Sequence, residues 1–387
     1  MRDFASGYAG RQLSLHALGL VVTLSGVLVV APLLPAIIET FGISPATAGV
    51  SISVLWATNA LVQYPGGRYA DQLPSAVVLL ASQSLLIFGF LTLALSTTFP
   101  QFVLGLTLVG TGYGTFEPAG MVLLGDLFDE RRGRAFGIRD AAVNLGSTLS
   151  AALAAVVLTY ATWRAAFVPI AVFLFLVAFS LHRTTRETYR TSSVDLDLRT
   201  TARRLVETPQ AGALIAVTAL SLFAWQGTAS FLPTFLQAEK EFSELGATLG
   251  FAGLFLVGTV TTPFAGALGD RWSHLRVAAV TTGFSIVGLG TLVVAHRRLL
   301  VVVGLFVFAV GLTTFWPVIY VHLVEQLSSE TVGGDLGALR TAYFALGSLG
   351  PSYVGLVAAE YDYSLAFASL LVCFVLTGMV VLWLSER

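Results

Sequence analysis

The chain has 387 residues, of which 56% are hydrophobic and only 11% are charged, and its formal net charge is −1. Soluble domains carry about 25% charged residues, so this composition indicates a membrane protein. The near-neutral charge argues against a large basic surface for nucleic acid, and the single cysteine, Cys373, excludes an intrachain disulfide and a thiolate metal site.

A membrane-spanning helix needs roughly 20 mostly apolar residues. Twelve such runs follow one another along the chain, and the first is too long for a cleavable signal peptide. They are 13–38, 46–69, 76–96, 101–125, 135–160, 164–182, 211–236, 244–269, 276–295, 299–325, 336–358 and 364–384. We therefore predict an all-α polytopic protein with an N-terminal six-helix bundle in 1–182, a cytoplasmic central loop in 183–210 and a C-terminal six-helix bundle in 211–387.

The two predicted halves share a repeated phrase. "TFEPAGMVLLGD" at 115–126 returns as "TFWPVIYVHLVE" at 314–325, which is 199 residues later. Five further matches, among them "GGRYAD" at 66–71 with "GALGD" at 266–270, keep nearly the same offset. Repeats of this kind fix an architecture, so we expect two pseudo-symmetric bundles that arose by duplication.

The distribution of basic residues predicts how the chain is oriented in the membrane. With the N-terminus in the cytoplasm, 17 of the 21 Lys and Arg residues lie on the inner side, and the outer side keeps only Arg164, Lys240, Arg297 and Arg298. This positive-inside bias predicts that both termini are cytoplasmic.

Four short motifs stand at matching places between the spans. They are "GGRYAD" after the second span, "DLFDERRGRAFGI" (126–138) after the fourth, "WRAAF" (163–167) before the sixth and "GSLGP" (347–351) in the eleventh. With twelve spans in two halves, the chain resembles the major facilitator superfamily (MFS) over essentially its whole length. The resemblance implies inverted three-span units within each half, a midplane site and alternating access, with spans 1, 4, 7 and 10 lining a central cavity.

Glu117 is an acid in the middle of the fourth span. It precedes Asp126, at the cytoplasmic end of that span, by nine residues, which is about 13–14 Å of helix and close to the middle of a ~30 Å hydrocarbon core. An acid at that depth is costly unless it faces a cavity or a partner, and burial favours its neutral form. We interpret Glu117 as a proton-carrying or cation-binding group. The alternative is a protonated glutamate that hydrogen-bonds between helices and has no role in transport.

Helical spacing places Tyr113 on the same face as Glu117, and the repeat places Trp316 and Tyr320 on the matching face of the tenth span. The resemblance adds two residues of span 7, and span 5 adds a weaker polar candidate. These are Trp225, Gln226 and Asn144. One acid, several aromatic rings and amides suit a small organic solute, neutral or cationic. The alternative is that the aromatic residues only pack helices or lie at the membrane interface.

Charged residues also gather at the cytoplasmic ends of the spans. We interpret seven of them as an inner gate whose ion pairs break when the protein opens inward: Asp71, Asp126, Arg139, Asp270, Arg271, Glu325 and Arg340. Positive-inside anchoring is the alternative, and anion binding is a further one for the arginines. His16 and His322 are interpreted as packed or interfacial residues, with proton transfer as the alternative.

The sequence has no GxxxxGK phosphate loop, no His, Cys and carboxylate cluster with metal-ligand spacing, and no Ser, His and Asp constellation at a membrane surface. We therefore predict no enzyme activity, no cofactor and no metal. The predicted function is secondary active, proton-coupled transport of a small organic solute across the cytoplasmic membrane.

Its expected partners are the solute, protons and the lipid bilayer, without nucleic acid, and the chain is expected to be a monomer. The alternatives are an anion or organic-acid transporter in which the midplane acid carries no proton, and a solute sensor that does not transport. Uptake and export both stay open.

Overall fold

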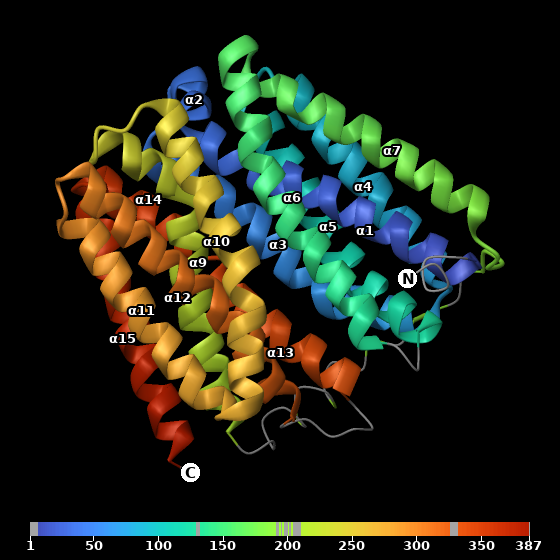
Figure 1. The fold of residues 1–387 in the computed structure, drawn as a ribbon. Helices are drawn as coiled ribbons and strands as arrows, with labels where there is room; N and C mark the ends of the chain where they lie inside the picture. The colour runs from blue at the N-terminus through green and yellow to red at the C-terminus, as the bar shows by residue number, and fades with distance from the viewer. Residues whose placement is uncertain are drawn as a thin grey trace. The chain divides into compact units, whose positions relative to one another are not determined.

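A computed structural model describes residues 7–128, 132–190, 193–194, 196, 200, 203, 210–325 and 332–386. Among these residues there are α-helices and one short 3-10 helix, η2, but no strand (Figure 1). The elements are α1 (Gly7–Leu28), α2 (Val30–Phe41), α3 (Pro45–Gln72), α4 (Ser75–Leu95), α5 (Phe99–Leu127), α6 (Arg132–Tyr160), η2 (Trp163–Ala166), α7 (Phe167–Thr184), α9 (Ala211–Ala238), α10 (Glu244–Arg271), α11 (His274–Val294), α12 (Arg298–Glu325), α13 (Val332–Gly347), α14 (Gly350–Glu360) and α15 (Tyr363–Ser385).

Within the described residues, eleven helical segments are long and apolar enough to cross a membrane. The helix of the predicted fourth span, α5, is not among them, although its 29 residues correspond to roughly 43 Å of helix. Its glycines, threonines and Glu117 lower its hydropathy, and half of its length is buried in protein instead of facing lipid. The predicted all-α polytopic architecture is confirmed.

Two of the predicted spans are broken helices. The first span ends as α1 at Leu28 and resumes as α2 at Val30. Pro32 explains this break, because its nitrogen has no hydrogen to donate to the carbonyl of Leu28. The eleventh span breaks after Gly347 and resumes at Gly350, where Pro351 occupies the first turn of α14 and needs no intrahelical partner.

The packing of the helices divides the chain into two compact units. Unit 1 comprises Met1–Val29 and Val54–Thr201, and unit 2 comprises Val30–Ser53 and Ala202–Arg387. The second half of span 1 and the first half of span 2 thus belong to the same unit as the C-terminal helices. The division at 183–210 stays a prediction, because a boundary set by duplication need not coincide with one set by packing.

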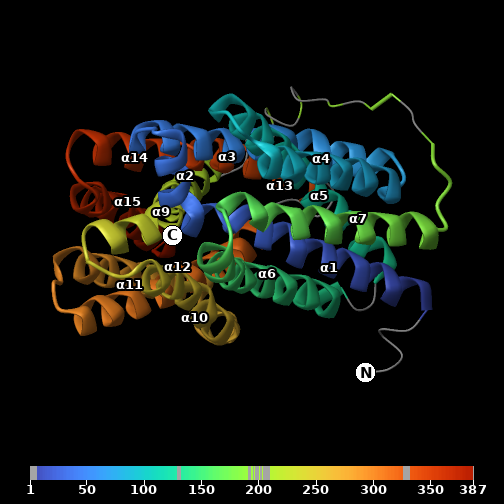
Figure 2. The same cartoon turned by 90° about the horizontal axis from the view of Figure 1, so that it is seen from above.

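One packing pattern occurs in both units. In unit 1, α1 packs against α6 and α7, and α4 packs against α5 and α7 (Figure 1, Figure 2). In unit 2, α9 packs against α13, α14 and α15, and α11 packs against α12 and α15. When the spans are counted from the start of each half, the same spans pack against each other in both units.

Glycines bring α5 close to α3 in unit 1. A Cβ atom on Gly110 would lie 2.2 Å from the carbonyl oxygen of Leu55, and one on Gly114 would lie 2.4 Å from that of Asn59. No real side chain fits at these distances, so the four-residue spacing of the two glycines lets the two backbones touch. This close approach holds the turn of α5 that carries Glu117 against α3.

In unit 2 a similar close approach joins α3 to α14. A Cβ atom on Gly49 would lie 2.3 Å from the carbonyl oxygen of Pro351, and one on Gly355 would lie 2.3 Å from that of Pro45. The backbone nitrogen of Ser352 donates to Ser53 Oγ at 2.9 Å. The first half of α3 is therefore fixed tightly to α14.

Candidate functional site

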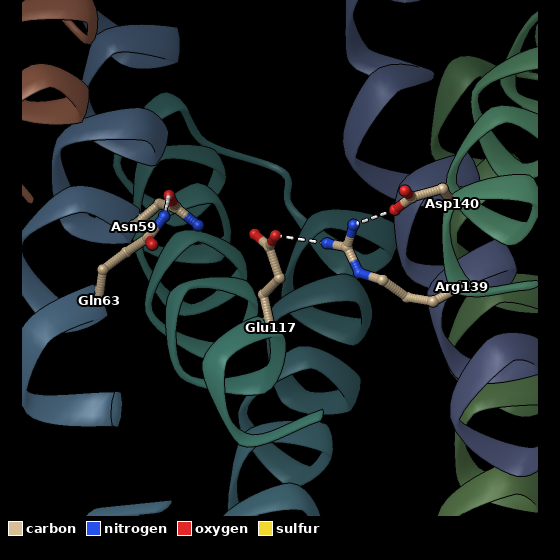
Figure 3. Close-up of polar contacts among 5 residues, drawn as sticks. All are labelled: Asn59, Gln63, Glu117, Arg139 and Asp140. Carbon is tan, nitrogen blue, oxygen red and sulfur yellow. Dashed lines mark hydrogen bonds and ion pairs between the residues drawn. The ribbon is translucent and has the colours of Figure 1, made fainter. Parts of the chain in front are cut away.

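An ion pair inside unit 1 contains the acid of the fourth span. Arg139 of α6 donates from Nη2 to Glu117 Oε1 of α5 at 2.5 Å, and from Nη1 to Asp140 Oδ1 at 2.5 Å (Figure 3). The Glu117 and Arg139 side chains are only 8% and 12% exposed, whereas the Asp140 side chain is 64% exposed. Arg139 thus joins a buried carboxylate to an exposed one.

This arrangement suits reversible protonation. Two buried charges of opposite sign offset part of each other's desolvation cost, whereas an unpaired buried charge is strongly destabilising. If Glu117 takes a proton, its bond to Arg139 weakens, but Arg139 keeps Asp140 as a counter-ion. The site can therefore change the protonation state of Glu117 without leaving the guanidinium uncompensated.

Amide side chains of α3 lie on the other side of Glu117. Figure 3 draws Glu117 between Arg139 and the pair of Asn59 and Gln63, and the close approach at Gly114 places α3 directly against α5 there. Gln63 Nε2 donates to Asn59 Oδ1 at 3.0 Å, and both residues are at most 2% exposed. Asn59 Nδ2 has no hydrogen-bond partner among the described residues. Uncharged polar groups thus accompany the ion pair inside the span.

Aromatic rings also flank the acid. Tyr113, one turn before Glu117, is 8% exposed, and its ring contacts Trp56 of α3 edge to face at 6.5 Å between centroids. The predicted proximity of Tyr113 to Glu117 follows from their positions on one helix face. Asn144, also predicted for this site, is half-buried on α6, five residues after Arg139.

The other predicted substrate residues lie in unit 2. Trp225 of α9 and Trp316 of α12 pack against one apolar cluster that includes Tyr343 of α13. The rings of Trp316 and Tyr343 are 6.1 Å apart between centroids. Gln226 is fully buried, and neither of its amide atoms has a hydrogen-bond partner among the described residues. Tyr320 is half-buried on α12.

The residues predicted as a cytoplasmic gate are distributed over both units. Asp71 and Asp126 are exposed at the ends of α3 and α5, and the charges of Arg68 and Asp126 act on Asp71. Arg271 is exposed at the end of α10. The side chains of Asp270 and Glu325 lie outside the described part of the chain.

Two of the three arginines of this predicted gate, Arg139 and Arg340, have most of their side chains inside the protein. Arg139 pairs with Glu117, so the structure places it in the same cluster as the midplane acid. Arg340, on α13, is 9% exposed, and its guanidinium lies 5.6 Å from the centre of the Phe344 ring.

Sequence reasoning missed the Glu117–Arg139 pair and the contribution of Tyr343. A signal for the first was present, because an arginine inside a span almost always pairs with an acid or a carbonyl at the same depth. No comparable signal exists for Tyr343, since its neighbour Trp316 lies on a different helix. Among the described residues, no group of three or more His, Cys, Asp and Glu side chains is placed to hold a metal.

Comparisons with known proteins identify proteins that this chain resembles in sequence. The "Uncharacterized MFS-type transporter YttB" of Bacillus subtilis (strain 168) is 21% identical over 97% of this chain and 96% of its own length. The "Probable 4-methylmuconolactone transporter" of Cupriavidus pinatubonensis is 30% identical, but only over 35% of this chain and 33% of its own.

Solved structures show the same fold. A bacterial homologue of the human lysosomal transporter Spinster, in an inward-facing and unoccupied conformation, superposes with a TM-score of 0.81 at 16% identity over 98% of both chains. A D-xylose–proton symporter superposes with a TM-score of 0.73 at 14% identity over 97% of both chains.

The family comparison covers nearly the whole chain. The pattern of the Major Facilitator Superfamily matches residues 17–255 and 214–387, which overlap in the seventh and eighth spans. This match agrees with the predicted family, with the predicted multi-pass membrane topology and with the prediction that the chain is not an enzyme. The chain belongs to the Major Facilitator Superfamily of transporters.

Proposed function

We propose that the protein is a proton-coupled secondary transporter that moves a small organic solute across the cytoplasmic membrane by alternating access. Glu117 is the proton-binding group, and Arg139 is the partner that holds it when it is ionised. Tyr113, Asn144, Trp225, Gln226, Trp316 and Tyr320 are the candidate solute contacts. The termini and the 183–210 loop face the cytoplasm, and the chain works as a monomer.

The buried pair of Glu117 and Arg139 carries this proposal. A protonated Glu117 no longer needs the guanidinium, so proton binding changes the link between α5 and α6. The pair thereby couples the charge of one carboxyl group to the packing of two spans, which is what a proton-driven conformational cycle requires.

Two of the similar proteins support the proposal by their names. One is a proton symporter for a small sugar, and one is a probable transporter of a small organic lactone. Aromatic rings and amides are the kinds of side chain that line binding sites for small organic molecules. The inner gate also remains a proposal: Asp71, Asp126, Asp270, Arg271, Glu325 and Arg340 are its members, and Arg139 links it to Glu117.

The test uses proteoliposomes that contain the purified full-length protein and a trapped pH-sensitive dye. A panel of organic acids, lactones, sugars and quaternary amines is added with and without an imposed pH gradient. A transported solute should carry protons with it. Glu117→Gln should abolish solute-dependent proton movement and gradient-driven accumulation, while exchange of labelled for unlabelled solute continues.

Glu39→Gln is the matched control, because it makes the same change at an exposed carboxylate of α2 and leaves both acids that pair with Arg139 in place. We expect it to retain coupled transport. Gradient-driven accumulation at the wild-type level in Glu117→Gln, at equal protein incorporation, would show that the proton is carried elsewhere. Solute binding without any exchange in the wild-type protein would favour a sensor.

A further inference from the structure

A small pocket in unit 1 is lined by two polar side chains that take no part in the Glu117–Arg139 ion pair. His16 of α1 and Gln83 of α4 line it together with Phe116, the residue before Glu117. Both polar residues are buried, with 4% and 1% of their surface exposed. The remaining lining is apolar, and the pocket has room for about one water molecule.

The polar atoms at this pocket lack protein partners. Both ring nitrogens of His16 and the Oε1 atom of Gln83 have no hydrogen-bond partner among the described residues. A buried polar group without a partner is unfavourable, because it has lost its hydrogen bonds to water. A pocket with donors and acceptors that are unpaired, and with space for a water molecule, is the kind of site at which proteins hold internal water.

Two glycines create the pocket. A Cβ atom on Gly120 would lie 1.8 Å from His16 Cε1, so the imidazole rests directly on the backbone of α5, one turn beyond Glu117. A Cβ atom on Gly19 would lie 3.1 Å from the Phe116 ring and 3.2 Å from Gln83 Nε2. The ring of His16 also lies 5.0 Å from that of Phe116 between centroids. The imidazole is thus held beside the turn of α5 that carries the acid.

The charged groups that act on His16 are Glu117 of α5 and Arg139 of α6. The other helices present uncharged groups to the pocket: Gln83 from α4, and Val177 and Leu181 from α7. Leu181 lies only three residues before the end of α7, on the side predicted to be cytoplasmic. The apolar lining of the pocket therefore extends toward that end of the bundle.

We propose that His16 and Gln83 bind a water molecule in this pocket and that the proton leaving Glu117 passes through it toward the cytoplasm. This inference rests on the proposed proton coupling. The O–H bond of the Glu117 carboxyl breaks, and its proton joins the pocket water, which gives one of its own protons to water of the cytoplasmic solvent. The carboxylate then pairs with Arg139. His16 and Gln83 are positioning residues, because they orient the water and keep no proton.

The experiment follows Glu117 directly, by infrared spectroscopy of the full-length protein in detergent. The carboxylic C=O band of protonated Glu117 is the band that Glu117→Gln lacks. After a jump to higher pH, the decay of this band reports proton release. We expect His16→Leu to slow the decay at least about tenfold, because proton transfer needs a hydrogen-bonded path. We expect the conservative variant His16→Gln, which still binds water, to stay within about twofold of wild type.

Gln83→Leu provides a second test from another helix and should also slow the decay, even if His16→Leu fails to fold. The matched control is Thr282→Val in the pocket of unit 2 lined by Thr282 and Phe315, the counterparts of Gln83 and Phe116 at the offset of 199 residues. It should leave the decay unchanged. A wild-type rate in both His16→Leu and Gln83→Leu, or equal slowing in His16→Leu and His16→Gln, would overturn this inference alone. A Glu117 band that never appears at any pH would overturn the proposed proton coupling as well.

Discussion

Arg139 pairs with two acids, of which Glu117 is buried and Asp140 is exposed. Because of this difference, the loss of Glu117 and the loss of Arg139 should lower the stability by different amounts. Removing one partner of a buried ion pair typically costs about 3–5 kcal/mol, since it leaves an uncompensated charge. When Glu117 is lost, Arg139 retains Asp140 at 2.5 Å. When Arg139 is lost, Glu117 loses the cation beside it.

We therefore predict that Arg139→Gln lowers stability by about 3 kcal/mol and Glu117→Gln by clearly less. Thermal unfolding of the two variants and the wild type in detergent measures both losses. An equal loss for the two variants would mean that Asp140 does not compensate Arg139.

At this scale the sequence predicted the site in part. A single acid in an apolar run is easily recognised in the sequence, so Glu117 could be found without a structure. Its partner could not, because helical periodicity tells which residues share a face but not which neighbouring helix that face meets. For this reason the sequence alone places Arg139 in the inner gate. The pocket at His16 depends on Gly120, which looks in the sequence like any other glycine of a span.

At the scale of elements, basic side chains fix the ends of matching helices in the two units. In unit 1, Arg164 Nε donates at 2.6 Å to the carbonyl oxygen of Ser96, which caps α4. In unit 2, Lys240 Nζ donates to the carbonyl oxygens of Val293 and Ala295 at 2.7 and 3.0 Å, at the end of α11. Carbonyls at a helix C-terminus have no intrahelical partner, so these cations stabilise both ends.

Lys240 gives a pH prediction because it lies outside the spans, between α9 and α10. Burial lowers the pKa of its ammonium from the ordinary value of 10.5, while Glu239 acts in the opposite direction. Between the lowered pKa and 10.5 the unfolded chain holds more protons than the folded one, so this group contributes more stability as the pH rises. The neutral amine can still donate to both carbonyls.

We predict that Lys240→Met lowers the melting temperature and that the difference in melting temperature from wild type grows as the pH rises toward 10.5. The comparison with wild type removes the pH dependence that comes from the ionisable groups present in both proteins. A difference that shrinks as the pH rises would mean that Lys240 acts mainly through its charge.

The helix of the fourth span shows why the element scale was less predictable than the overall fold. Its length and position were correct, but its hydropathy falls below that of the other spans because it packs glycines and Glu117 inside the protein. The breaks at Val29 and after Gly347 depend on Pro32 and Pro351. Proline is tolerated within many spans, so the sequence alone did not distinguish these two from Pro118 or Pro233, which lie inside continuous helices.

At the scale of the whole molecule, the positive-inside bias predicts which connections face the cytoplasm. In a Cys373→Ser background, Thr188→Cys lies in the central connection and His296→Cys lies between α11 and α12, and both positions are exposed. A membrane-impermeant maleimide should label His296→Cys in intact cells and Thr188→Cys only after the membrane is opened. The reverse pattern would invert the proposed orientation and, with it, the direction of the proton path.

The sharing of two spans between the units bears on the transport cycle. Val30–Ser53 packs with the C-terminal helices, whereas the rest of spans 1 and 2 packs with the N-terminal ones. If the two predicted halves move as rigid bundles, the packing of Val30–Ser53 within unit 2 must break in the alternate state. The closest approach is at Gly49, where an added Cβ would lie 2.3 Å from the Pro351 carbonyl oxygen and 3.2 Å from the α-carbon of Gly355.

Gly49→Ala should therefore favour the alternate state, in which this packing is broken. Overpacking costs about 1–3 kcal/mol where the backbones touch and nothing where they have separated, and about 1.4 kcal/mol is a tenfold change in population.

The reporter is Ser53→Cys in the Cys373→Ser background, since Ser53 is 7% exposed and accepts the hydrogen bond from Ser352. Labelling by an impermeant maleimide from outside should become about tenfold faster with Gly49→Ala. It should stay unchanged with Gly253→Ala on α10, where an added Cβ meets nothing within 4 Å. If both alanine variants label at the parental rate, the packing of α3 on α14 does not open during exchange between states, and the helices of Val30–Ser53 must instead bend where they leave unit 2.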